Sequence, residues 1–216
     1  IDFWLEDLVA DQFPSLSVAI VREGQIDYLR AFGWADIDEK IAADPQTPYN
    51  VASVTKALTG TLAAILHERE IVDLDKPLVK YLLPKVQVSN TPAVGSQITL
   101  RHLATHTSGL PRDIPGKVQS TEGAYALEPE RLYRQLADVS LNAPPGQNEL
   151  YSNLGFELLG HALENATQKS FGELIQEHIA GPLEMNFTFI PESGSTSRRD
   201  FRVATGYART FKIRHE

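Results

Sequence analysis

The order of apolar and polar residues along the chain predicts strands at both ends and helices between them. Residues 2–13 carry apolar side chains at helical spacing. Residues 16–22 and 25–33 are typical of two strands joined at Glu23-Gly24. We therefore expect an N-terminal helix followed by an antiparallel hairpin.

The middle of the chain has the periodicity of packed helices. A long helix is expected to start near Ser53, with Leu58, Leu62, Ile65 and Leu66 as its buried stripe. Cap and stop signals predict further helices over 99–106 (capped by Thr99), 130–139, 154–166, and from the capping box Ser170-Phe171-Gly172-Glu173 to Gly181-Pro182. Residues 37–49 and 71–83 are expected connections, 112–126 a loop that either borders a site or is plain surface, and 187–190 and 202–207 strands.

Strands, then helices, then strands again favour an α/β (α+β) fold with a helical insertion. We expect a single domain over 1–216, with an α/β part at about 1–50 and 185–216 and a helical part at about 51–184.

Composition excludes several functional classes. A net charge of −8 disfavours nucleic acid as a partner, because phosphate binding needs clustered cations. The chain has no cysteine, so it has neither disulfides nor thiolate chemistry. No apolar run approaches the ~20 residues that span a bilayer, and no pattern calls for a cofactor.

Ser53-Val54-Thr55-Lys56 is the first candidate for chemistry. Positions i and i+3 share a helix face, so the Lys56 amine can reach the Ser53 hydroxyl. A serine hydroxyl is a weak nucleophile until a neighbouring base takes its proton. A lysine amine can be that base when burial or nearby cations lower its pKa.

A second candidate segment, Tyr151-Ser152-Asn153, lies about a hundred residues later. The Tyr151 phenol could act as an acid or base, and the Asn153 amide could bind a substrate carbonyl or Lys56. With Ser53 and Lys56, these residues predict acyl transfer through a covalent serine ester.

Two other groupings have simpler explanations. His102 and His106 lie four residues apart, but the zinc-protease pattern needs Glu after the first His, where Leu103 stands. Structural hydrogen bonding is the favoured role, and no metal site is predicted. Asp73 and Asp75 are typical of helix-end and turn chemistry.

The nucleophile segment and further motifs in the same order resemble the serine β-lactamase and penicillin-binding-protein superfamily. The branch that is most similar holds class C β-lactamases, D-alanyl-D-alanine carboxypeptidases and related serine esterases. The segments that carry the resemblance are 16–24, 31–36, 51–56, 98–111, 145–153 and 181–185.

The resemblance implies an antiparallel sheet flanked by helices plus a helical subdomain, with Ser53, Lys56 and Tyr151 catalytic and Asn153 binding substrate. β-Lactams, D-amino-acid peptides and short-chain esters all suit such a site. The implied partner is thus a small molecule or peptide, and a bacterial member is expected to be periplasmic or secreted rather than cytoplasmic.

One departure from the family pattern alters the expectation. The family's third motif, Lys-Thr-Gly or His-x-Gly, has no match after Tyr151, and Ala204-Thr205-Gly206-Tyr207 resembles only the segment before it. The resemblance therefore implies a C-terminally incomplete chain and sheet, completed by a missing segment or a partner chain. It leaves open a catalytically inactive binding or regulatory module, and a metallohydrolase is a distant third.

Overall fold

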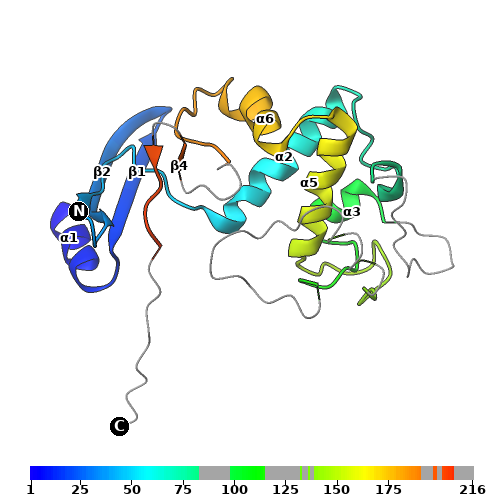
Figure 1. Cartoon of the computed structure of the whole chain (residues 1–216), viewed down its shortest axis with the longest axis horizontal. Coiled ribbons are helices and arrows are strands. Elements are labelled where there is room, and N and C mark those ends of the chain that lie inside the picture. Colours follow the sequence, from blue (N-terminus) through cyan, green and yellow to red (C-terminus); the bar gives the residue numbers. More distant parts are fainter. Residues whose placement is uncertain are drawn as a thin grey trace, which may run out of the picture. The chain divides into compact units, whose positions relative to one another are not determined.

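The computed structural model describes most of the chain, which divides into two compact units: residues 1–51 with 194–216, and residues 52–193 (Figure 1). The residues described are 1–82, 98–114, 132, 136, 139–190, 197–198 and 201–206.

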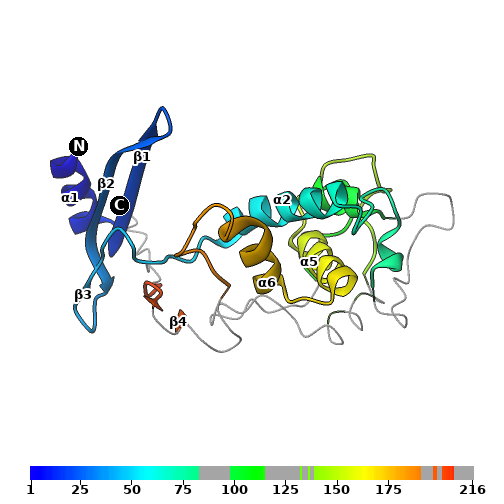
Figure 2. The same ribbon diagram turned by 90° about the horizontal axis from the view of Figure 1, so that it is seen from above.

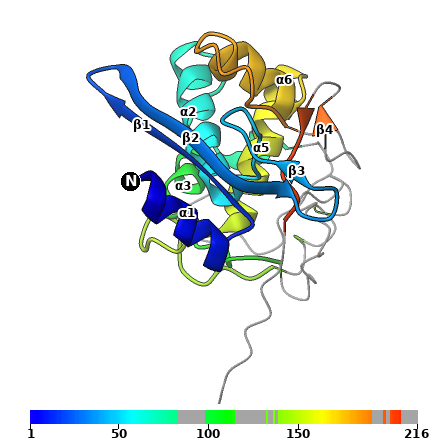
Figure 3. The same cartoon turned by 90° about the vertical axis from the view of Figure 1, so that its left-hand side faces the viewer.

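The first unit is built around an antiparallel hairpin. β1 (Ser15–Arg22) pairs with β2 (Gln25–Asp36), and α1 (Asp2–Asp11) lies alongside β2 (Figure 3). The turn residues Glu23 and Gly24 have φ angles of 50° and 77°, the positive values that a two-residue type I′ turn requires. The predicted helix and hairpin are confirmed.

Short strands complete the first unit. β3 (Ile41–Ala42), which the sequence did not predict, extends the sheet in the order β1-β2-β3. β4 (Ser197–Arg198) and β5 (Phe201–Arg202) form a separate pair. Of the strand expected over 202–207, only the first residue is in β5. Thr205 instead donates its backbone N–H to the Ala35 carbonyl of β2 at 2.8 Å and its hydroxyl to the Asp36 carboxylate at 2.9 Å, without forming a strand.

The second unit is helical, and α2, α5 and α6 lie side by side in it (Figure 2). Three expected helix starts are confirmed: one near Ser53, one at about 154 and one at the Ser170 capping box. The expected Thr99 cap is confirmed as well. The elements are η1 (Ala52–Val54), α2 (Thr55–Glu68), η2 (Leu78–Lys80), α3 (Leu100–Ala104), α5 (Asn153–Thr167), α6 (Phe171–Ile175) and a π-helical turn over Gln176–Ala180.

Leucine side chains from these helices form the core of the second unit. Full burial of one such side chain stabilises a fold by roughly 1.5–3 kcal/mol, so this core anchors both helices that carry the candidate site. Leu58 and Ile65, which were expected in the buried stripe of α2, are only partly buried and pack against the edge of this core. The fully buried leucines include Leu62, Leu66, Leu78, Leu100, Leu103, Leu154, Leu158, Leu159 and Leu163.

The strand predicted at 187–190 is wrong. Thr188 donates its N–H to the Met185 carbonyl at 3.0 Å, a turn contact, and its own carbonyl accepts from the Gln176 side chain at 2.5 Å. These two bonds occupy the Thr188 N–H and carbonyl, the middle of the segment, with partners that are not in a strand. Much of the predicted helix 130–139 and of the loop 112–126 lies outside the described residues.

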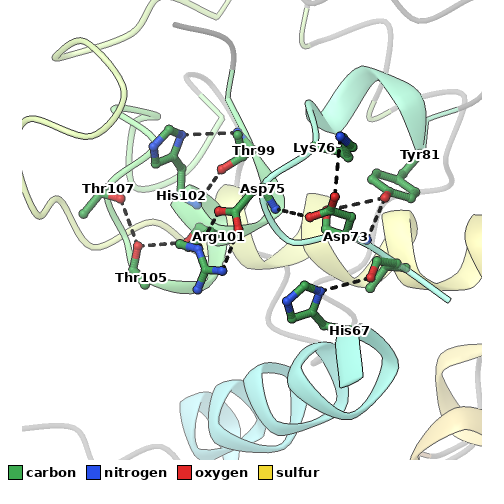
Figure 4. A network of polar contacts seen from close by, with 11 residues as sticks. His67, Asp73, Asp75, Lys76, Tyr81, Thr99, Arg101, His102, Thr105 and Thr107 are labelled. Atoms are coloured by element: carbon green, nitrogen blue, oxygen red, sulfur yellow. Dashed lines mark hydrogen bonds and ion pairs between the residues drawn. The ribbon is translucent and has the colours of Figure 1, made fainter. Parts of the chain in front are cut away.

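A polar network, which we call the Asp73–Arg101 network, joins the end of α2 to the start of α3 (Figure 4). Asp75 accepts two hydrogen bonds from the Arg101 guanidinium, at 2.6 and 2.8 Å. Asp73 accepts from the backbone N–H of Asp75 at 3.0 Å, the turn contact expected from the sequence. Tyr81 accepts from the backbone N–H of Asp73 at 2.8 Å.

Candidate active site

The start of α2 brings a hydroxyl and an amine together. Ser53 lies in the 3-10 turn that leads into the helix, and Lys56 lies in the first helical turn. The Lys56 Nζ atom is 3.3 Å from the Ser53 Oγ atom. Ala52, just before the serine, has a φ angle of 43°, an unfavourable conformation for a residue with a Cβ and one that tends to occur at functional sites.

Two side chains from the start of α5 complete the cluster. Tyr151 donates its phenolic O–H to the Ser53 Oγ atom at 2.8 Å. The Asn153 Oδ1 atom accepts a hydrogen bond from Lys56 Nζ, also at 2.8 Å. A chain of hydrogen bonds thus links all four side chains singled out from the sequence, although about a hundred residues separate the two segments.

Ser152, to which the sequence analysis gave no role, lies between Tyr151 and Asn153 and anchors the start of α5. It is fully buried and is the N-cap of α5, accepting the Gly155 N–H at 2.8 Å. The same hydroxyl donates to the Pro111 carbonyl at 2.7 Å. A Ser immediately before the first residue of an apolar helix is a cap signal, so the sequence does contain the information.

His106 packs behind the phenol. Its ring centroid lies 4.5 Å from that of Tyr151 and 4.8 Å from that of Phe156. Its Nδ1 atom accepts the backbone N–H of Ser152 at 3.1 Å, which leaves the neutral ring's proton on Nε2. Burial, and then the Lys56 charge, lower the pKa of His106 and so favour this neutral form.

His102 also has a hydrogen-bonding role, as expected. Its Nδ1 atom accepts the N–H of Thr99, while its own N–H donates to the Thr99 hydroxyl, a reciprocal cap of α3. Among the described residues, no group of three or more His, Asp or Glu side chains could hold a metal ion.

A further segment, Pro111–Asp113, crosses the start of α5. The Arg112 carbonyl accepts the backbone N–H groups of Asn153 and Leu154 at 2.8 and 3.2 Å. The Arg112 guanidinium lies 5.2 Å from the centre of the Tyr151 ring. The Asn153 Nδ2 atom donates to the Asp113 carboxylate at 2.9 Å. Arg112 and Asp113 fall in the loop expected over 112–126, and nothing in the sequence distinguished them from the rest of it.

The loop that leads into this segment is fixed by a close approach. Gly109 has a φ angle of 75°, and a Cβ there would lie only 1.9 Å from the Ala143 carbonyl oxygen. Its own carbonyl accepts the N–H of Asn142 at 2.7 Å. A side chain at Gly109 would therefore push apart the two loops that border the site.

Positive charge dominates the electrostatics around the phenol. Hydrogen bonds with Lys56 and then Ser53 lower the pKa of Tyr151, and the Lys56 and Arg112 charges act in the same direction. Each of these interactions favours the phenolate over the phenol. The tyrosine side chain remains 40% exposed, so the groups that meet here are accessible from solvent.

The Ser53 hydroxyl thus accepts hydrogen bonds from a phenol and an amine, the kinds of group that can activate a serine nucleophile. The profile of the beta-lactamase family matches residues 1–215, and the chain belongs to that family. The family and fold class expected from the sequence are therefore confirmed.

Individual relatives agree with this assignment. The chain is 31% identical over 204 residues to protein flp of Staphylococcus aureus, covering 93% of this chain and 39% of that protein. It is 34% identical over 180 residues to the D-alanyl-D-alanine-carboxypeptidase/endopeptidase AmpH of Escherichia coli, covering 83% of this chain and 46% of that protein. The chain thus spans less than half the length of these curated relatives.

A solved structure is similar as well. The beta-lactamase/D-alanine carboxypeptidase of Yersinia pestis, in complex with citrate, superposes with a TM-score of 0.72 at 29% identity. The match covers 86% of this chain and 55% of that one.

Proposed function

We propose that the chain carries the nucleophile half of a serine hydrolase site that transfers an acyl group through a covalent Ser53 ester. The observation that carries this proposal is the convergence on Ser53. Tyr151 O–H lies 2.8 Å from its Oγ atom, Lys56 Nζ lies 3.3 Å from it, and Asn153 binds that amine.

In the acylation step, the Ser53 oxygen attacks the carbonyl carbon of an amide or ester. Its proton passes to the Lys56–Tyr151 pair, both members of which lie within hydrogen-bonding reach of Ser53 Oγ. To accept that proton the pair must carry one proton fewer, either as an ammonium with a phenolate or as a neutral amine with a phenol. The tetrahedral intermediate collapses as the C–N or C–O bond breaks, and the leaving group takes that proton. Attack by water on the ester, with the same pair accepting its proton, restores Ser53.

The negative charge on the intermediate needs donors. The backbone N–H of Ser53 is the proposed first donor, and in the family the second comes from the strand of the third motif, which this sequence lacks. Loss of one such donor costs roughly 3–4 kcal/mol of transition-state stabilisation. We therefore expect turnover by this polypeptide alone to be slow, and covalent labelling to be the more sensitive assay.

The proposed substrate is a β-lactam, a D-amino-acid peptide or a short-chain ester. The relatives named for D-alanine carboxypeptidase activity support the peptide. None of the helices that the structure describes is both apolar enough and long enough to cross a membrane.

The test is covalent labelling with a fluorescent penicillin and with an aryl phosphonate, followed by intact mass measurement. We expect wild type to gain one adduct and Ser53→Ala to gain none. Because a Ser-to-Ala change removes only the hydroxyl oxygen, the thermal melting curve of the variant should match wild type. Equal labelling of both proteins would contradict the proposal. Saturable binding of both reagents without adduct or turnover would instead favour an inactive binding module.

A further inference from the structure

The Asn153 side chain is held at both ends, and the two ends differ in kind. Its oxygen accepts from the Lys56 ammonium at 2.8 Å, while its nitrogen donates to Asp113 Oδ1 at 2.9 Å. An ammonium can only donate and a carboxylate can only accept, so the two partners together determine which way the amide points.

Asp113 is itself held in place. Its second oxygen, Oδ2, faces the Arg112 Nε atom at 3.6 Å, and its side chain is 38% exposed. The backbone of Arg112 is bound to the first N–H groups of α5. Both carboxylate oxygens therefore have neighbours within the protein: the Asn153 amide at hydrogen-bond distance and the exposed Arg112 guanidinium at 3.6 Å.

Resting on the proposed function, we propose that Asp113 is a positioning residue that acts through Asn153. It holds the amide nitrogen so that the amide oxygen faces the Lys56 ammonium beside Ser53. If the amide flipped, its N–H groups would face an ammonium that cannot accept a hydrogen bond. The flexible stem of Lys56 would then lose the contact that aims it.

The first experiment measures the Asp113–Asn153 contact itself and needs no activity. In ¹⁵N-labelled wild-type protein, the Asn153 side-chain amide signals are identified by their loss in Asn153→Ala. We expect its two amide protons to differ widely in chemical shift, because one is bonded to a carboxylate. In Asp113→Asn this difference should shrink. An unchanged pair of signals in Asp113→Asn would overturn the proposal.

Asp75→Asn is the matched control for this comparison. Asp75 is a carboxylate of the same unit that also accepts from side-chain N–H groups, but its partner is Arg101. The Asn153 signals should be the same in Asp75→Asn as in wild type.

The second experiment asks whether the contact matters for the reaction. Saturation kinetics of phosphonate labelling separate the binding constant from the rate of bond formation. For Asp113→Asn we expect that rate to fall about tenfold, the typical effect of a lost hydrogen bond between an amide and a charged group. Binding and the melting temperature should change little. A loss confined to binding would contradict a positioning role.

A double-mutant cycle tests whether Asp113 affects the labelling rate through Asn153. If Asp113 acts through Asn153, adding Asp113→Asn to Asn153→Ala should cost no more than about a further twofold. Losses that multiply independently would overturn the proposal. Failure of wild type to label would overturn the proposed function, while the NMR comparison would still decide whether Asp113 holds Asn153.

Discussion

Two polar clusters of the helical unit differ in how their charges are matched. In the Asp73–Arg101 network, the Arg101 guanidinium meets the Asp75 carboxylate in two hydrogen bonds. In the candidate site, the Lys56 ammonium bonds to the Ser53 hydroxyl and the Asn153 amide, which are both neutral, and lies beside the Tyr151 ring. The ion pair of Asp75 and Arg101 neutralises both charges and links two segments of the chain. The positive charge of Lys56 is not neutralised by Ser53 or Asn153, so it can lower the pKa of a neighbouring acidic group.

The largest difference between the clusters is expected for the removal of a phenol. Tyr151→Phe should slow labelling by about a hundredfold, because it removes one member of the proton-accepting pair. Tyr81→Phe is the matched control in the network, where the phenol accepts from Asp73. It should weaken stability and leave the labelling rate unchanged. Similar labelling rates for Tyr151→Phe and Tyr81→Phe would contradict a chemical role for the Tyr151 phenol.

The pH dependence of labelling sharpens this prediction. Because Lys56 and Ser53 lower the pKa of Tyr151, its phenolate forms at lower pH than in free tyrosine, for which the pKa is about 10. In wild type the labelling rate should rise with pH and level off below that value. In Tyr151→Phe this rise should be absent.

A mutation at the α3 cap, which lies next to Arg101 of the network, should produce a smaller effect, on stability rather than chemistry. Thr99→Ala removes the hydroxyl that accepts the His102 N–H at the start of α3, at a cost of about 1 kcal/mol in the free energy of unfolding. Thr99→Ser keeps the hydroxyl and should recover most of that loss. Urea denaturation measures both. Equal losses in the two variants would show that the hydroxyl is not the cause.

The smallest expected effect is that of Asp75→Asn, because the pair that it breaks is exposed. The hydrogen bond with Arg101 lowers the pKa of Asp75, so this contribution to stability is present above the unfolded-state pKa and is lost as pH falls through the folded-state pKa. The melting temperatures of wild type and Asp75→Asn should therefore differ slightly at pH 7 and converge below about pH 4. A gap that persists in acid would rule out the ion pair as its source.

Local patterns predicted the elements of this fold better than the contacts between them. The cap at Ser170 and the turn at Glu23-Gly24 depend on neighbouring residues, and both were read correctly. The strand at 187–190 failed because strand formation depends on a partner elsewhere. The Thr188 backbone instead bonds to the Met185 carbonyl and to the Gln176 side chain.

The candidate site shows the same limit. Ser53 and Lys56 could be paired from helix geometry, and the family resemblance linked them to Tyr151 and Asn153. Asp113 could not be found in this way, because its role depends on where a loop crosses the start of α5. The spacing of residues within the loop does not show which part of the chain it contacts.

The buried cap of α5 constrains how sequences of this kind can change. Tyr151 and Asn153 flank Ser152, and each reaches a different atom at the start of α2. Ser152 is extended, and it is the single residue between the phenol and the first residue of the helix. A residue inserted on either side of Ser152 would change the interval between phenol and amide, so that the two could no longer reach Ser53 and Lys56 together.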